Sequence, residues 1–123
     1  MIQIYTTPSC ASCRKAKKWF DQYKIPYSEK NIFSIKLSKE DIFKMLANSE
    51  NGFDDIISTR SKVFKEKQLE PDNMTIQELV DFIIENPSVL KRPIIINENE
   101  LQVGYNNEDI TIFLPKELRN REC

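Results

Sequence analysis

Residues 2–16 read IQIYTTPSCASCRKA, a short apolar strand pattern followed by two cysteines three positions apart. The cysteine pair opens a helical pattern, and the positive end of a helix dipole stabilises a thiolate at Cys10. Residues three apart on a first helical turn are neighbours, so Cys13 can attack the same sulfur or be attacked by it. The basic residues between positions 14 and 18 favour the thiolate further. This stretch predicts a reversible dithiol/disulfide centre.

Two other roles for the cysteines are a zinc site and inert core packing. Tetrahedral zinc usually takes four Cys or His ligands, whereas this chain has no histidine and one further cysteine, Cys123. Buried, unreactive cysteines are common in protein cores, but Pro8, Ser9 and Ser12 favour a partly exposed site. We therefore expect redox chemistry, with no metal and no cofactor.

The composition indicates one ordinary globular core. The chain has 123 residues, of which 40% are hydrophobic and 30% charged. No apolar run approaches the roughly 20 residues needed to cross a bilayer, and the first residues show neither the basic nor the apolar region of a signal peptide. We expect a cytoplasmic protein without membrane contact, in which a Cys-x-x-Cys pair is catalytic or sensory.

The charge and the missing residue types exclude several function classes. A net charge of −1 argues against a general nucleic-acid binder, although basic residues gather at 14–18, 60–67 and 116–121. The absence of histidine excludes Ser-His-Asp and Cys-His hydrolysis. With two glycines, the chain has no Gly-rich phosphate loop. Any chemistry must use thiols, arginines and backbone amides.

The chain begins with a β-α-β pattern. Residues 2–6 read as a strand, residues 11–23 carry apolar side chains at helical spacing, and residues 25–31 read as extended. A Cys-x-x-Cys between the first two elements is typical of a thioredoxin-type opening.

A helical block follows at residues 35–88. Capping boxes begin two of its helices, at Ser38 with Asp41 and at Thr75 with Glu78. Asn51-Gly52 follows the first of these as a C-terminal cap would, and further short helical turns are expected near residues 53–57 and 63–64.

The C-terminal part returns to strands. Ile94-Ile95-Ile96 has the pattern of a buried strand, Leu101 and Val103 alternate like a return strand, and a final helix carries Ile110, Phe113 and Leu114. The predicted fold is α/β: a thioredoxin-like four-stranded mixed sheet with flanking helices and an inserted helical domain. Residues 1–34 and 89–123 would form a discontinuous redox domain, and residues 35–88 the inserted domain.

Arg92-Pro93 stands directly before the isoleucine run. In thioredoxin-like folds a cis proline at this point faces the thiols, whereas a trans proline that begins a strand is the ordinary alternative, and the sequence leaves both open. Arg92 and Arg60 are candidates to approach Cys10, because a guanidinium suits oxyanions. A surface ion pair is the other reading of either arginine.

Several runs together resemble the Spx regulators of Gram-positive bacteria, within the wider arsenate reductase (ArsC)-like family. These runs span nearly the whole chain in order: Ile4-Tyr5-Thr6, Pro8-Ser9-Cys10, Cys13-Arg14-Lys15-Ala16, Asn31-Ile32-Phe33-Ser34, Ile56-Ile57-Ser58-Thr59-Arg60-Ser61-Lys62, Arg92-Pro93-Ile94-Ile95-Ile96 and Leu101-Gln102-Val103-Gly104-Tyr105-Asn106.

The resemblance implies a non-enzymatic, cytoplasmic transcription regulator that binds the C-terminal domain of the RNA polymerase α subunit. It implies that Gly52 lies at this contact, that Cys10 and Cys13 form a disulfide under thiol stress, and that Arg92 responds to their oxidation state. It also implies turnover by a ClpXP-type protease. We further expect a monomer in which Lys62, and with it Lys65, touches promoter DNA only inside the polymerase complex.

The main alternative is an arsenate-reductase-like or glutaredoxin-like thiol oxidoreductase, which the Cys-x-x-Cys pair fits equally well. Arsenate reductases surround one cysteine with three arginines. The third would fall near Tyr105-Asn106-Asn107, where this chain has no arginine. A plain thioredoxin-fold interaction module would leave both cysteines without a role.

Overall fold

The computed structural model describes residues 2–58 and 61–115, and its centre is a four-stranded sheet with strand order β2-β1-β3-β4. β1 (Ile2–Thr6) pairs in parallel with β2 (Tyr27–Asn31) and antiparallel with β3 (Ile94–Ile96), which pairs antiparallel with β4 (Leu101–Val103). Helix α1 (Ala11–Gln22) supplies the crossover that a parallel strand pair needs. The predicted α/β fold with a mixed sheet is confirmed.

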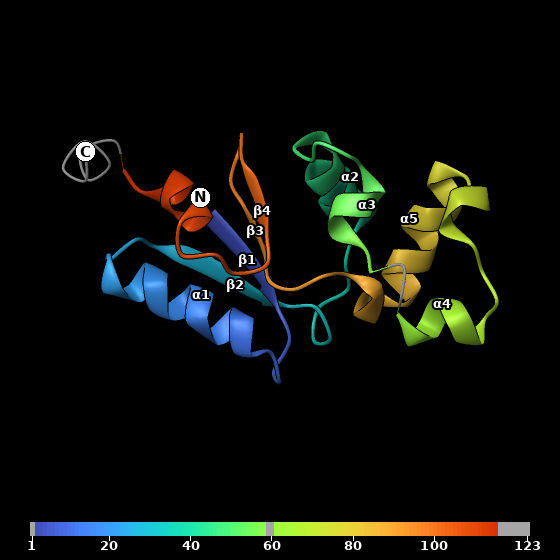
Figure 1. Cartoon of the computed structure of the whole chain (residues 1–123), viewed down its shortest axis with the longest axis horizontal. Coiled ribbons are helices and arrows are strands. Elements are labelled where there is room, and N and C mark those ends of the chain that lie inside the picture. Colours follow the sequence, from blue (N-terminus) through green and yellow to red (C-terminus); the bar gives the residue numbers. More distant parts are fainter. Residues whose placement is uncertain (1, 59–60, 116–123) are drawn as a thin grey trace.

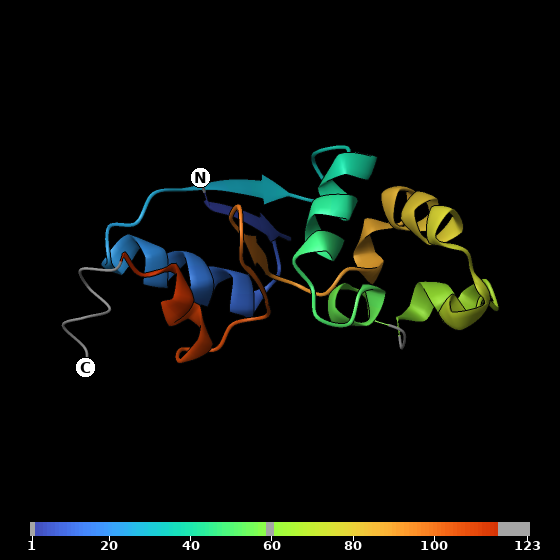
Figure 2. The same ribbon diagram turned by 90° about the horizontal axis from the view of Figure 1, so that it is seen from above.

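Short helices fill the chain between β2 and β3. They are α2 (Lys39–Ala47), α3 (Phe53–Ile56), α4 (Lys62–Glu66), the 3-10 turn η1 (Pro71–Asn73), α5 (Ile76–Glu85) and the 3-10 turn η2 (Pro87–Val89). Figures 1 and 2 both show them gathered beyond one end of the sheet, away from α1. The division into domains at residues 34/35 and 88/89 stays a prediction. No helix in the described ranges is both long and apolar enough to cross a membrane.

Alternating side chains let β1 and β3 contribute to two apolar clusters. Ile4 and Ile95 pack with Phe20 of α1 and with Phe113 of the 3-10 helix η3 (Asp109–Phe113). The next residues along the strands, such as Tyr5, belong to a second cluster that continues into α2, α4 and α5. The sheet is therefore the element that both clusters share.

The two predicted capping boxes are confirmed. Ser38 Oγ accepts the Asp41 N–H at 3.1 Å while the Asp41 carboxylate accepts the Ser38 N–H at 2.9 Å. Thr75 and Glu78 make the same reciprocal pair at the start of α5. Each box satisfies N–H groups that a helix start otherwise leaves without partners.

Gly52 is not the C-terminal cap that the sequence predicts. α2 already ends at Ala47, and Gly52, with φ +67°, stands directly before α3. Ser49 causes the difference, since its hydroxyl donates to the Leu46 carbonyl and accepts the Gly52 N–H, which closes a turn between the two helices. The left-handed backbone there is one that glycine adopts without strain.

The predicted final helix is a 3-10 helix that stops one residue early. It covers Asp109–Phe113, and Leu114 is already extended at φ −67° and ψ 139°. Pro115 explains this ending, because a proline disfavours helical backbone at the preceding residue. At the other end, the Asn106 side-chain oxygen accepts the N–H groups of Glu108 and Asp109 and so organises a tight turn.

Candidate functional site

Cys10 is the N-cap of α1. Its backbone is extended, and its sulfur accepts the Cys13 N–H at 3.1 Å. A sulfur therefore takes the capping position that Ser, Thr or Asp usually fills. The helix begins here because the strand before it is followed by a turn in which the Cys10 N–H bonds the Thr7 carbonyl. Positive partial charge at the helix start faces the Cys10 sulfur.

The two cysteines differ in exposure and in protonation. Both are free in this structure, Cys10 half-buried and Cys13 buried. Burial, followed by the hydrogen bond with Cys10, raises the pKa of the Cys13 thiol to about 12, while the charge of Arg92 opposes the rise. Cys13 is therefore a protonated thiol at neutral pH beside a more accessible sulfur, which is the arrangement of an attacking and a resolving cysteine.

Arg92 lies across from the cysteines on the segment that leads into β3. Its Nη1 donates to the carbonyls of Ser88 and Leu90, at 3.1 and 3.3 Å. The Arg92-Pro93 peptide bond is cis. These contacts hold the guanidinium at the mouth of the site without a carboxylate partner among the described residues.

A surface hollow of about 630 Å³ joins the cysteine loop to the helical part of the molecule. Cys10 and Arg92 both line it, and Phe33, which is 57% exposed, stands beside them. The remaining lining residues are Thr7, Pro8, Ser9, Ser58, Ser61, Ser88, Leu90 and Lys91. Among the described residues that line it, the hollow has hydroxyls and two cations but no carboxylate, so an anion would meet no like charge there.

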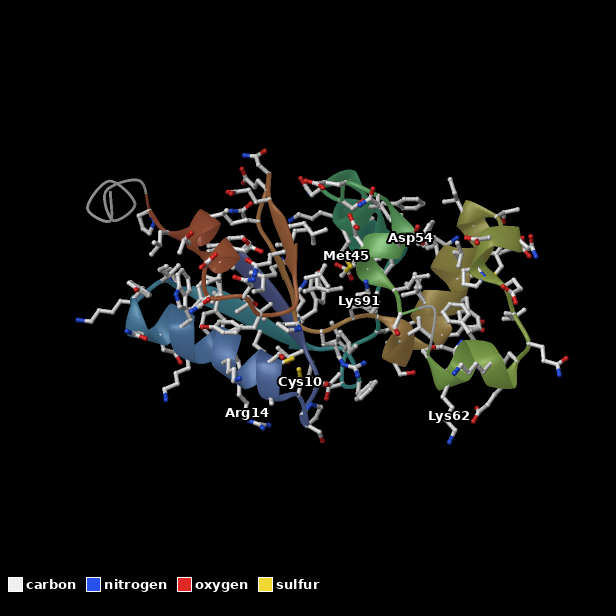
Figure 3. All side chains as sticks on the ribbon, in the orientation of Figure 1. Cys10, Arg14, Met45, Asp54, Lys62 and Lys91 are labelled. Atoms are coloured by element: carbon white, nitrogen blue, oxygen red, sulfur yellow. The ribbon has the colours of Figure 1, made fainter. Side chains whose placement is uncertain are left out.

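The segment carrying Arg92 is tied to α3. Ile57 and Leu90 form an antiparallel bridge, and the Lys91 N–H donates to the Ile56 carbonyl at 2.8 Å. The Lys91 ammonium also donates to the Asp54 carbonyl oxygen at 3.2 Å, and Figure 3 labels both residues. Because α3 begins directly after Gly52, a continuous set of hydrogen bonds connects the mouth of the cysteine site to the Gly52 turn.

Gly52 and Lys62 lie away from the cysteines. Gly52 is on the turn between α2 and α3, and a Cβ added there would meet nothing within 4 Å. Lys62 begins α4, where its side chain is 88% exposed and its Nζ lies 3.7 Å from Glu66 Oε1. Arg60 and Cys123 lie outside the described residues. In the ranges 2–58 and 61–115, no cluster of acidic residues and cysteines could hold a metal ion.

Two polar contacts near the site were not predicted. The buried Thr6 hydroxyl donates to Glu29 at 2.8 Å, and Lys17 of α1 pairs with the same carboxylate at 2.9 Å, which lowers the pKa of Glu29. The Tyr5 hydroxyl lies 3.2 Å from Asp41 and so joins β1 to α2. A threonine and a tyrosine inside an apolar strand pattern were the available signals for these contacts.

Comparison with known proteins places these features in a family. The model of the ArsC family matches residues 5–113. The global transcriptional regulator Spx of Listeria monocytogenes (serovar 1/2a) is 50% identical over 119 residues, which cover 97% of this chain and 91% of that protein. The global transcriptional regulator Spx of Bacillus subtilis is 49% identical over 120 residues, covering 98% and 92%.

Solved structures agree on the fold. A putative arsenate reductase from Yersinia pestis superposes with a TM-score of 0.82 at 18% identity, over 92% of this chain and all of that one. A putative ArsC family related protein from Bacteroides fragilis gives a TM-score of 0.75 at 26% identity, over 88% and 92%. The thioredoxin-like architecture predicted from the sequence is thus shared with ArsC-type structures.

Proposed function

This chain belongs to the ArsC family, within its Spx group of transcriptional regulators, and from this premise we propose that it is a cytoplasmic redox sensor acting through RNA polymerase. The sensor is the pair Cys10 and Cys13. The output is binding of the C-terminal domain of the polymerase α subunit, through a surface that includes Gly52, and control of genes for thiol and oxidative stress.

The observation that carries the proposal is the unequal cysteine pair at the start of α1. Oxidation removes two electrons and two protons from the pair and forms one sulfur–sulfur bond, and the electrons pass to a thiol oxidant of the diamide class. The Cys10 sulfur would then no longer accept the Cys13 N–H in its present form. This covalent change beside Arg92 would let the arginine exchange partners.

The contacts between Lys91 and α3 support a route from the cysteines to the α-subunit surface. Lys91, adjacent to Arg92, bonds α3 through both its main chain and its side chain. α3 follows Gly52 without an intervening residue. We therefore propose that a change in the Arg92 segment alters the Gly52 turn, which the partner would approach closely.

Promoter DNA is proposed as a partner only within the polymerase complex, through Lys62 and with it Lys65. A chain of net charge −1 should have negligible affinity for duplex DNA at physiological salt, because phosphate neutralisation drives such binding. We also propose a monomer that is turned over by a ClpXP-type protease.

An arsenate-reductase-like activity is the second candidate, favoured by the carboxylate-free hollow that Cys10 shares with Arg92. The absence of an arginine at positions 105–107 argues against it, since charge developing in a transition state would be less well stabilised.

One pair of assays tests both candidates. The purified full chain is mixed with the α C-terminal domain in a calorimeter, and in parallel with arsenate, glutathione and glutaredoxin. We expect binding of the α domain and no arsenate turnover at enzyme-like rates. Turnover without α binding would reverse the order of the two candidates.

A further inference from the structure

Helix α1 carries a row of cations on its exposed side. Lys18 follows Arg14 by four residues and Lys15 by three, so the three side chains share one face of the helix, and all three residues are exposed. We call these three residues the α1 cationic face. Ion pairs between described residues involve Lys17, Lys30, Lys39 and Lys62, and none involves the α1 cationic face.

A hollow of about 450 Å³ adjoins this face. Lys15 and Lys18 line it together with Gln22 and Asn107, and the aromatic side chains of Trp19 and Tyr105 complete it. Ammonium and amide N–H groups are the donors that proteins use on phosphate oxygens. No described residue that lines the hollow has a carboxylate that would compete for these donors.

Asp21, at the C-terminal end, is the one carboxylate within α1. The described lining of the hollow at Cys10 also lacks carboxylates, whereas three other surface hollows each contain two or more. Those three lie beside α2 and α3, beside α4 and η1, and between α2 and α5. The α1 cationic face thus adjoins a hollow whose described lining holds cations without carboxylates, unlike these three.

Lys62 of α4 is a second cation with an exposed side chain, 3.7 Å from Glu66 Oε1. Figure 3 shows the labelled side chains of Arg14 and Lys62 extending from the same edge of the molecule, with Cys10 between them along that edge. Figure 1, in the same orientation, shows the start of α1 and α4 toward this edge. Cations thus stand at two separated points along one side of an elongated molecule.

We propose that the α1 cationic face is a second contact for the sugar–phosphate backbone of promoter DNA, used while the protein is held by the α subunit. The inference rests on the proposed function, and it adds α1 to the surface that faces DNA. Duplex DNA fits better than an acidic protein segment, because a rigid polyanion is long enough to meet cations on both α1 and α4. The contact reads phosphates and carries no base specificity.

We expect the α1 cationic face to have little affinity for DNA unless the bound α domain tethers the protein to the promoter. A few lysine–phosphate contacts give weak binding at physiological salt. Once the α domain is bound near a promoter, the same contacts form within one complex, at an effective concentration set by the tether. The α1 cationic face therefore strengthens a complex that the α subunit has already positioned.

The test compares Lys15→Glu/Lys18→Glu with Lys36→Glu/Lys44→Glu, a control with the same charge change at exposed positions off α1. Binding of the α C-terminal domain is measured first, without DNA. Binding to RNA polymerase holoenzyme on a promoter that the wild-type protein activates is then measured across a salt series. Circular dichroism verifies that each variant is folded.

We expect both variants to bind the isolated α domain like the wild type. On the promoter, Lys15→Glu/Lys18→Glu should bind about tenfold more weakly, and the slope of log K against log salt should fall by about 2, since each lost phosphate contact removes about 0.9. The control should keep the wild-type slope. An unchanged slope for the α1 variant would overturn the inference, and so would its loss of α binding without DNA, which would assign the face to a protein. Failure of the wild type to bind the α domain would instead refute the proposed function.

Discussion

The Lys91 ammonium donates a hydrogen bond to the main-chain oxygen of Asp54 at 3.2 Å, and so fastens the segment next to Arg92 onto helix α3. The two residues are 37 positions apart in the chain. A lysine that reaches a helix carbonyl across this separation connects the cysteine site with the helix that follows Gly52. In the proposed regulator this contact is a mechanical link between sensing and partner binding.

Replacing Lys91 with methionine should weaken that link and leave the fold intact. The hydrogen bond is exposed, so its loss should reduce the free energy of unfolding by no more than about 1 kcal/mol. We expect Cys10 and Cys13 to oxidise as in the wild type, while the gain in transcription after diamide falls by half or more. Transcription in a reconstituted polymerase assay measures this, with Lys44→Met as the control. A full diamide response in the Lys91→Met variant would show that the contact transmits nothing.

The raised pKa of Cys13 predicts how stability depends on pH. The thiol has a pKa of about 12 in the folded chain, against an ordinary value of 9.0. Between these values the unfolded chain releases a proton that the folded chain retains, so stability is complete below about pH 9 and falls as pH rises toward 12. Urea unfolding at a series of pH values, with a reductant present, should show this decline.

Cys13→Ala should flatten the decline relative to the wild type. The variant loses some stability at all pH values, because a buried sulfur is removed, but the pH-dependent part belongs to the thiol. Lysines and tyrosines that titrate in the same range contribute equally to both curves and cancel in the comparison. Parallel curves for Cys13→Ala and wild type would contradict the assignment.

Much of the sheet and its helices could be predicted from local pattern. The run Ile94-Ile95-Ile96 marked a buried strand, and the pairs Ser38 with Asp41 and Thr75 with Glu78 marked two helix starts, because a capping box needs only residues three positions apart. Gly52 was assigned to the wrong helix end because the Ser49 hydroxyl closes the turn before it. A serine in a polar loop gives no sign of which carbonyl it will bond.

The candidate site could be predicted only in part. The spacing of Cys10 and Cys13 predicted the redox pair. Arg92 was predicted from its position before a strand that must lie near the pair. Three separate segments contribute Phe33, Ser61 and Ser88 to the hollow that Cys10 and Arg92 line. Nothing in the local sequence marks these three residues as part of a site, and only the fold brings them together.

Gly52→Arg should abolish binding of the α domain at the cost of a modest loss of stability. Arginine at φ +67° is strained by about 1 kcal/mol or more, but its Cβ meets no atom within 4 Å, so the fold should survive. Gly104→Arg is a matched control, because Gly104 has φ +83° and equally open space. We expect Gly104→Arg to lose similar stability and to retain α binding in calorimetry. Equal effects of the two substitutions on binding would remove Gly52 from the interface.

The dithiol switch makes the sharpest prediction, because Cys10 and Cys13 lie together at the start of α1 and differ in exposure. Cys10 is half-buried at a helix start, Cys13 is buried behind it, and Cys123 lies outside the described residues. Diamide should therefore produce one intramolecular disulfide, between Cys10 and Cys13, which mass spectrometry of proteolytic fragments identifies.

The functional half of that prediction follows from the same geometry. Cys10→Ala removes the sulfur that caps α1, and Cys13→Ala removes the partner that would close the bond, so each variant should lose the transcriptional response to diamide. Cys123→Ala should respond like the wild type, because neither partner of the proposed bond is changed. If Cys10→Ala and Cys13→Ala still respond to oxidant, or if the disulfide found involves Cys123, these two cysteines are not the switch.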